Sequence, residues 1–305
     1  MNGGPLQRAL GRGILMLDGA MGTELHRRGV DTGLPLWSAA AVVTHPQIVR
    51  RIHREYIESG ADIITTNTFR TTARTFRRAG LSDRSEELTA RAVALAIEAS
   101  ATTSNREVLI AGCIAPLEDC YRVDLVPSDE DLAQEHAELA GRLARYGVDF
   151  LLLETIGSVR EAAAASAAAT STGKEVMVSF LVHETGTLYS GEPLEDAIRA
   201  VSQAGVVALS LNCLSPRIVE APLQLLRSTT TLPLGVYANV GRPGQEHSEE
   251  LVADVSPEEY ASYALAWANA GASIIGGCCG TTPTTMRAVR EILDRDKDRG
   301  SEHER

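Results

Sequence analysis

The chain has 305 residues, 44% of them apolar, and a formal net charge of −11. This length allows one large domain with a substantial core. The acidic balance argues against nucleic acid and anionic membrane surfaces as partners, because both attract clustered Lys and Arg. No stretch approaches 18 continuous apolar residues, so the sequence predicts no membrane-spanning helix.

Short apolar runs alternate with helix-length stretches along the whole chain, and buried parallel strands read as such runs. The predicted strands cover residues 14–17, 62–65, 108–112, 149–153, 176–180, 207–211, 234–237 and 273–275. Helix-length stretches between them include 85–101, 129–146, 160–172 and 257–270.

Start and stop signals support these helices. Ser128 and Ser256 each precede acids in a first helical turn, where a hydroxyl caps the helix. Gly60, Gly147 and Gly271 each stand just before a predicted strand, where glycine permits the left-handed turn that ends a helix.

Eight strands with intervening helices predict a single-domain α/β fold, a (β/α)8 TIM barrel over residues 1–295. A doubly wound open sheet is the alternative, but it usually has fewer strands, and no glycine-rich dinucleotide loop follows the first strand. We expect residues 296–305 to form a charged, disordered tail.

In such a barrel the active site lies where the strands end. Polar or sulfur-containing side chains at the predicted strand ends are Asp18, Asn67, Cys113, Glu154, His183, Asn212, Cys213, Asn239, Cys278 and Cys279. A purely apolar layer at the strand ends would not contain so many polar groups at equivalent positions, so these strand ends predict a functional site.

Three of these cysteines, Cys213, Cys278 and Cys279, suit a metal. Three thiolates are the ligand set of a catalytic zinc with an open fourth position, whereas structural zinc normally takes four ligands, often from CxxC pairs, which this chain lacks. The alternatives are small buried thiols, or a disulfide between Cys278 and Cys279. Cys113 is a weaker candidate for a fourth ligand, and Cys120 reads as a buried thiol.

Asp18 and Glu154 each follow a strand directly and are predicted to bind substrate. The alternatives are a helix cap for Asp18 and an ion pair with an arginine for Glu154. A structural role is the better interpretation of His183, and Asn239 suits a pocket or a turn equally.

Two further features leave alternatives open. Trp37 and Tyr121 lie in loop-like stretches and could flank a cationic group or simply pack under a loop. Gly276 and Gly277 precede a predicted helix start, where many barrels bind phosphate, although the cysteines that follow favour a metal.

Five motifs in this order resemble the homocysteine S-methyltransferases, which have a zinc-dependent, homocysteine-binding barrel. They are residues 18–24 (DGAMGTE), 61–69 (ADIITTNTF), 153–155 (LET), 211–213 (LNC) and 276–280 (GGCCG). The resemblance spans nearly the whole chain.

By this resemblance Cys213, Cys278 and Cys279 hold Zn²⁺, and Asp18 and Glu154 hold the amino acid part of homocysteine. Asn212 would lie next to the metal, and we expect Asn67 and Asn212 to contribute to the substrate site. Betaine-using relatives carry tyrosines where this chain has Arg70 and Thr155, which counts against betaine as the methyl donor.

The resulting hypothesis is a methyl transfer from a sulfonium donor, S-methylmethionine or S-adenosylmethionine, to L-homocysteine, giving methionine. The alternatives are a homocysteine- and zinc-binding subunit that serves a separate donor-binding protein, and a metal-independent barrel enzyme acting on a phosphorylated substrate. Five cysteines and a start without an apolar signal stretch predict a reducing cytoplasm. The sequence does not identify which sulfonium is the donor or how many chains assemble.

Overall fold

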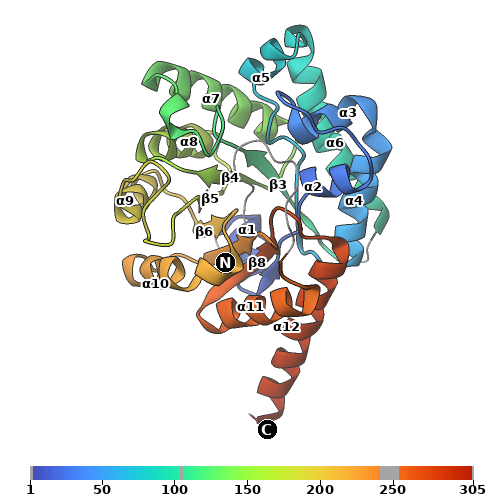
Figure 1. The fold of residues 1–305 in the computed structure, drawn as a ribbon, viewed down its shortest axis with the longest axis vertical. Helices are drawn as coiled ribbons and strands as arrows, with labels where there is room; N and C mark the ends of the chain where they lie inside the picture. Colours follow the sequence, from blue (N-terminus) through green and yellow to red (C-terminus); the bar gives the residue numbers. More distant parts are fainter. Residues whose placement is uncertain (1–2, 104–105, 241–253, 304–305) are drawn as a thin grey trace.

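The computed structural model describes residues 3–103, 106–240 and 254–303. Within them, eight parallel strands form one sheet in the order β1-β8-β7-β6-β5-β4-β3-β2. A parallel bridge between Leu17 and Ile63 joins β1 to β2 and closes the sheet. The helices surround this closed sheet (Figure 1). The predicted single-domain (β/α)8 barrel is therefore confirmed.

The strands are β1 (Leu15–Met16), β2 (Ile63–Thr65), β3 (Leu109–Ile114), β4 (Phe150–Ile156), β5 (Val176–Phe180), β6 (Ala208–Asn212), β7 (Leu234–Ala238) and β8 (Ala272–Gly277). The α-helices are α1 (Pro5–Leu10), α2 (Gly22–Arg27), α3 (Ala40–Thr44), α4 (Pro46–Glu58), α5 (Ala73–Arg78), α6 (Ser85–Thr103), α7 (Asp129–Arg145), α8 (Val159–Thr170), α9 (Leu194–Gln203), α10 (Glu220–Thr229), α11 (Pro257–Asn269) and α12 (Pro283–His303).

The local signals in the sequence act as predicted. The Ser128 hydroxyl accepts a hydrogen bond from the backbone of Asp131, and Ser256 forms a reciprocal capping box with Glu259. Gly60, Gly147 and Gly271 have φ angles of +106°, +90° and +97°, the left-handed region that only glycine enters without strain.

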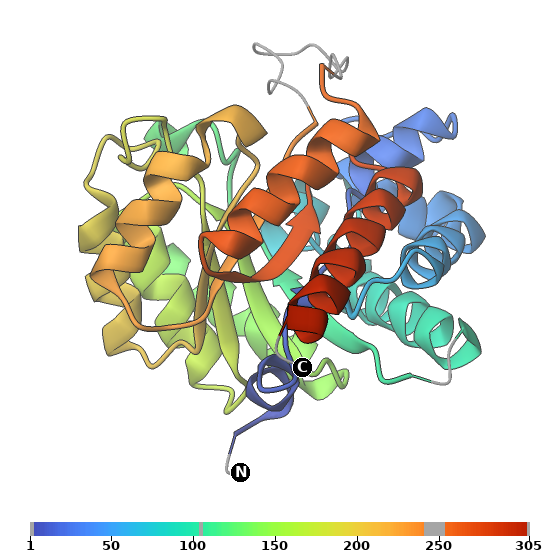
Figure 2. The same ribbon diagram turned by 90° about the horizontal axis from the view of Figure 1, so that it is seen from below.

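The core has an inner and an outer layer. Apolar side chains inside the barrel, such as Leu17, Phe150 and Ile274, pack with Leu6 and Ala9 of α1. Helix α1 therefore plugs the end where the strands begin (Figure 2). Glu175 accepts hydrogen bonds from the first-turn amides of this short helix and holds it there. Because α1 fills the end where the strands begin, the functional site is expected at the opposite end, where the strands finish.

The expectation of a disordered tail over residues 296–305 is corrected by α12, which continues to His303. Alternating acids and bases are compatible with a helix, and Arg290 pairs with Asp294 one turn later at 3.0 Å. Residues 304–305 lie outside the described part of the chain. Among the described residues, no helix is long and apolar enough to cross a bilayer.

Candidate metal and substrate site

Three sulfur atoms meet where β6 and β8 end. The Sγ atoms of Cys213, Cys278 and Cys279 all lie within 4.8 Å of one another, and those of Cys213 and Cys279 are 3.9 Å apart. Cys213 is buried, whereas Cys278 and Cys279 are partly exposed. The three thiols are free, so no disulfide links Cys278 to Cys279.

The spacing of these sulfurs fits zinc. With Zn–S bonds of about 2.3 Å, tetrahedral geometry places two sulfur ligands about 3.8 Å apart. Three soft thiolates also favour zinc over Mg²⁺ or Ca²⁺, which prefer oxygen ligands. The partial exposure of Cys278 and Cys279 leaves one side of the cluster accessible. The residues present therefore fit a zinc ion with an open fourth position.

The chain reaches this arrangement by tight backbone turns. Cys213 follows β6 directly with a φ angle of +60°, which is strained for a residue with a side chain. At the end of β8, a Cβ atom on Gly276 would come within 2.7 Å of Leu17, and one on Gly277 within 2.4 Å of Thr281. The two glycines thus let β8 approach its neighbours and deliver Cys278 and Cys279 to the cluster.

Polar neighbours favour a thiolate at Cys213. Hydrogen bonds from the thiols of Cys278 and Cys279 hold the pKa of Cys213 well below its usual value, and Tyr121 and Asn239 lower it further, against the effect of burial. The hydroxyl of Tyr121 lies 3.0 Å from the Cys213 sulfur. The protein thus provides donors for a charged sulfur at this position.

Asp18 is held at the end of β1 by its neighbour β2. One carboxylate oxygen accepts a hydrogen bond from the Thr65 amide and the other from the Thr65 hydroxyl, each at 2.9 Å. Asp18 does not cap the helix that follows it, whose N-cap is Met21. Burial raises the pKa of Asp18 to about 8, although the Thr65 hydrogen bonds oppose this and nearby Glu154 adds to it.

Glu154 faces the same region from β4. The register of β4 shifts between Leu153 and Ile156, and such bulges redirect side chains next to functional sites. Its Oε2 accepts a hydrogen bond from the Cys113 thiol at 3.0 Å, so its partner is a thiol and not the arginine considered from the sequence. Burial raises the pKa of Glu154 to about 7, while the Cys113 hydrogen bond lowers it.

Asp18, which is buried, and Glu154, which is partly buried, therefore form a pair of carboxyl groups whose charges disfavour each other. A cationic group placed between them would relieve this repulsion and restore both charges. The α-ammonium group of an amino acid is such a cation.

The Asn212 amide links three strands beside the sulfurs. Its Oδ1 accepts hydrogen bonds from the Thr155 amide at 3.0 Å and the Ser179 hydroxyl at 2.7 Å. Its Nδ2 donates to the Thr155 hydroxyl at 3.0 Å and lies 4.0 Å from the Cys278 sulfur. Thr155 has a φ of +60°, so Asn212 holds a strained residue directly after Glu154.

Asn67, the remaining predicted substrate residue, is 2% exposed and donates from Nδ2 to the Ser38 carbonyl at 2.9 Å. Its Oδ1 is buried without a partner in the described structure, so one polar atom is left for a ligand or a water. Contacts of Asn67, Asn212, Asp18 and Glu154 with a substrate stay a prediction.

The other candidates take different positions. Cys113 binds Glu154 and is not part of the three-cysteine cluster found among the described residues. His183 stacks on Tyr189 with ring centroids 4.2 Å apart, as suits a structural histidine. Cys120 packs against Cys213 in a small buried cluster. Trp37 packs over Gly22, where a Cβ atom would meet its indole ring at 2.4 Å.

The glycine turn does not present a phosphate cradle. The Gly277 amide donates to the Asp18 carbonyl at 3.0 Å, and the Cys278 amide donates to the Ala238 carbonyl at 2.8 Å. The Gly280 amide donates to the Thr23 hydroxyl at 2.9 Å. A phosphate needs free amides at such a turn, and these three are already bonded.

Sequence reasoning missed several residues that support the site. The sequence marks Thr65 and Ser179 only as strand residues, and it does not indicate the contact of Tyr121 with Cys213. Tyr237 was also missed; its hydroxyl is buried without a hydrogen-bond partner among the described residues, and burial followed by the charge of Glu154 raises its pKa. A signal exists for Thr65 and Tyr237, since both lie at predicted strand ends, but the sequence does not indicate that Thr65 binds Asp18.

Comparisons with known proteins agree with this geometry. The sequence model of the homocysteine S-methyltransferase family matches residues 15–293. A selenocysteine Se-methyltransferase of Brassica oleracea var. italica is 32% identical, over 92% of this chain and 89% of its own. The homocysteine S-methyltransferase of Escherichia coli K12 is 33% identical, over 91% of this chain and 94% of its own. The crystal structure of the Escherichia coli homocysteine methyltransferase MmuM in its metallated form superposes with a TM-score of 0.82 at 32% identity, covering 94% of this chain and 99% of the other.

Proposed function

Because the chain belongs to the homocysteine S-methyltransferase family, we propose that it transfers a methyl group from a sulfonium donor to L-homocysteine at a zinc site. The observation that carries the proposal is the cluster of Cys213, Cys278 and Cys279 at the strand ends, with the carboxyl groups of Asp18 and Glu154 at neighbouring strand ends. The products are methionine and the demethylated donor.

Zinc bound by the three cysteines would supply the activation of the acceptor thiol, since a coordinating thiol loses its proton at neutral pH. Asp18 and Glu154 would bind the α-ammonium group of homocysteine, and so orient its side chain toward the sulfurs. Asn212 maintains the backbone that presents Glu154 and places its amide beside Cys278.

The residues of the site also suit a sulfonium donor. Such a donor carries a positive charge that disappears when its methyl group is transferred, and a zinc ion with three thiolates, which has a net negative charge, would attract it before transfer. The displacement needs little acid–base assistance, so its rate depends on positioning and on the activated sulfur. S-Methylmethionine and S-adenosylmethionine both have this chemistry.

The relatives support a second acceptor of the same chemical type. Two of those most similar in sequence are named selenocysteine methyltransferases, each 32% identical to this chain. A selenol is softer and more acidic than a thiol, so the same site would accept selenocysteine. The five free cysteines of the chain suit a reducing compartment, which we propose is the cytoplasm.

A donor and acceptor panel on the zinc-loaded chain tests the proposal. We expect methionine from homocysteine with at least one of the two sulfonium donors, and none from the Cys279→Ser variant or the metal-stripped protein. Zinc bound at about one equivalent without methyl transfer from any donor would favour a binding subunit that needs a separate donor protein. Activity that survives stripping would refute the zinc site.

A further inference from the structure

Tyr121 touches a predicted metal ligand from a loop that carries no ligand of its own. The loop runs from β3 to α7, and the hydroxyl of Tyr121 lies 3.0 Å from the Cys213 sulfur. A tyrosine hydroxyl ordinarily titrates at about pH 10, so the phenol keeps its proton at neutral pH. Toward a thiolate, a neutral phenol is a hydrogen-bond donor.

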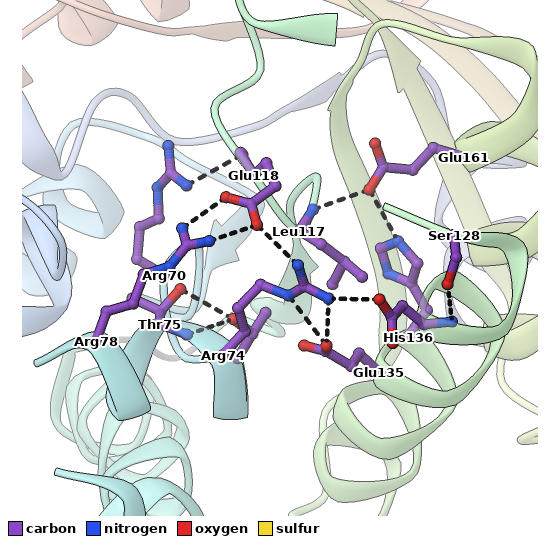
Figure 3. Close-up of polar contacts among 12 residues, drawn as sticks. Arg70, Arg74, Thr75, Arg78, Leu117, Glu118, Ser128, Glu135, His136 and Glu161 are labelled. Atoms are coloured by element: carbon purple, nitrogen blue, oxygen red, sulfur yellow. Dashed lines mark hydrogen bonds and ion pairs between the residues drawn. The ribbon is translucent and has the colours of Figure 1, made fainter. Parts of the chain in front are cut away.

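The loop is fixed at its start by a group of ion pairs (Figure 3). The Glu118 carboxylate binds Arg74 at 2.8 Å and Arg78 at 2.6 Å, both from α5. Although burial raises it, the pKa of Glu118 lies below its usual value because these arginines donate hydrogen bonds to the carboxylate. Arg74 also binds Glu135 of α7 at 2.8 Å, which links the two helices that flank the loop.

The backbone of the same segment is held as well. The Leu117 amide donates to Glu161 at 2.8 Å, and the Glu118 carbonyl accepts from Arg70 at 3.0 Å (Figure 3). The Tyr121 amide donates to the Asp119 side chain at 2.9 Å, which forms a tight turn. These contacts leave the backbone between Leu117 and Tyr121 little freedom.

Aromatic packing fixes the ring of Tyr121. It lies 5.6 Å from the ring of Tyr189 at an angle of 59°, and Tyr189 in turn stacks on His183. The hydroxyl is therefore held by the backbone on one side and by the ring contacts on the other. Such preorganisation means that little entropy is lost when the hydrogen bond to sulfur forms.

We propose that Tyr121 is a positioning residue for the metal centre, which donates a hydrogen bond to the Cys213 thiolate and orients its sulfur toward Cys278 and Cys279. The hydrogen bond also withdraws charge from this ligand and so stabilises a zinc site that holds three thiolates. Outer partners of metal ligands typically change metal affinity by about 10- to 100-fold. The inference rests on the zinc site of the proposed function, but not on methyl transfer.

The test compares Tyr121→Phe with Tyr189→Phe, which removes a hydroxyl from the neighbouring ring and leaves the sulfur contact intact. Zinc affinity is measured by competition with a chromogenic chelator, and cobalt-substituted protein gives the sulfur-to-metal charge-transfer band. We expect Y121F to bind zinc about 10- to 100-fold more weakly. Its charge-transfer band should move to longer wavelength, because a thiolate without a hydrogen bond is easier to oxidise. Y189F should behave as the wild type in both measurements.

A second variant tests the role of Tyr121 while leaving the tyrosine side chain unchanged. Glu118→Gln weakens the ion pairs that fix the loop, so it should lower zinc affinity in the wild-type background and have no further effect in the Y121F background. Equal losses in both backgrounds, or an unchanged band in Y121F, would overturn the role of Tyr121. A wild-type protein that takes up zinc but shows no methyl transfer refutes the proposed function alone, whereas one that takes up no zinc refutes both.

Discussion

The Cys113 thiol donates a hydrogen bond of 3.0 Å to Oε2 of Glu154, between the neighbouring strands β3 and β4. Burial raises the pKa of Glu154 to about 7. The hydrogen bond from Cys113 opposes this effect because it stabilises the charged carboxylate. Burial therefore moves the ionisation of Glu154 upward from the acidic range toward neutral pH. A cysteine first considered as a metal ligand thus adjusts the charge of a predicted substrate-binding residue.

Replacing Cys113 with alanine should raise the pH midpoint at which homocysteine affinity increases. Binding of an ammonium group is favoured by ionised Glu154 and Asp18, so affinity in the wild type should rise as the pH rises through about 7 to 8. Without the thiol the pKa of Glu154 rises, and the increase in affinity occurs at higher pH. Calorimetric titrations across pH measure the midpoint, and an unchanged midpoint would remove Glu154 or its thiol partner from the binding step.

Cys279→Ser should abolish zinc retention with the fold preserved. Two thiolates and an alcohol hold zinc poorly, because an unionised hydroxyl is a weak ligand for a borderline-soft ion. Metal analysis should give about one equivalent for the wild type and for Cys113→Ala, whose thiol lies outside the cluster, and far less for Cys279→Ser. Equal zinc in all three proteins would place the metal elsewhere.

Asn212→Ala should destabilise the fold as well as the site. It removes the partner of the buried Thr155 amide, and an unsatisfied buried group costs about 1–3 kcal/mol in the free energy of unfolding. The strained backbone of Thr155 also loses its support. Denaturant unfolding measures the change, with Ser228→Ala, which removes an exposed hydroxyl, as the control. A loss no greater than that of the control would show that Asn212 does not stabilise this backbone.

His53 should make the protein sensitive to acid. It is fully buried in α4, neither ring nitrogen has a hydrogen-bond partner in the described structure, and burial lowers its pKa from 6.5 to about 4. As pH falls below 6.5 the unfolded chain takes up a proton that the folded chain cannot accept until about 4, so the unfolding free energy falls across this window. The full effect is on the order of 3 kcal/mol.

His53→Leu should therefore flatten the pH dependence of unfolding between these two values. The exposed residue His26, replaced by glutamine, serves as the control. Urea unfolding across acidic pH measures both variants. A wild-type slope retained by His53→Leu would assign the acid sensitivity to other groups.

The sequence predicts the barrel strands of this molecule better than the contacts made by its loops. All eight strands and the cluster of Cys213, Cys278 and Cys279 follow from apolar runs and from the rule that parallel strands end at one face. The partners of Glu154 and Tyr121 do not, because one depends on a β-bulge and the other on a loop fixed by distant arginines. The helical end of α12 was missed because its charge pattern reads equally as helix or as a solvated tail.

In the proposed site the acceptor's chalcogen atom is the fourth ligand of a zinc ion held by three cysteines, and X-ray absorption at the zinc edge with L-selenohomocysteine measures this directly. The zinc-loaded protein should show three sulfur neighbours from the chain, and adding the selenium compound should introduce one selenium neighbour at bonding distance. A zinc spectrum that shows no selenium neighbour at saturating ligand would show that the acceptor does not bind the metal.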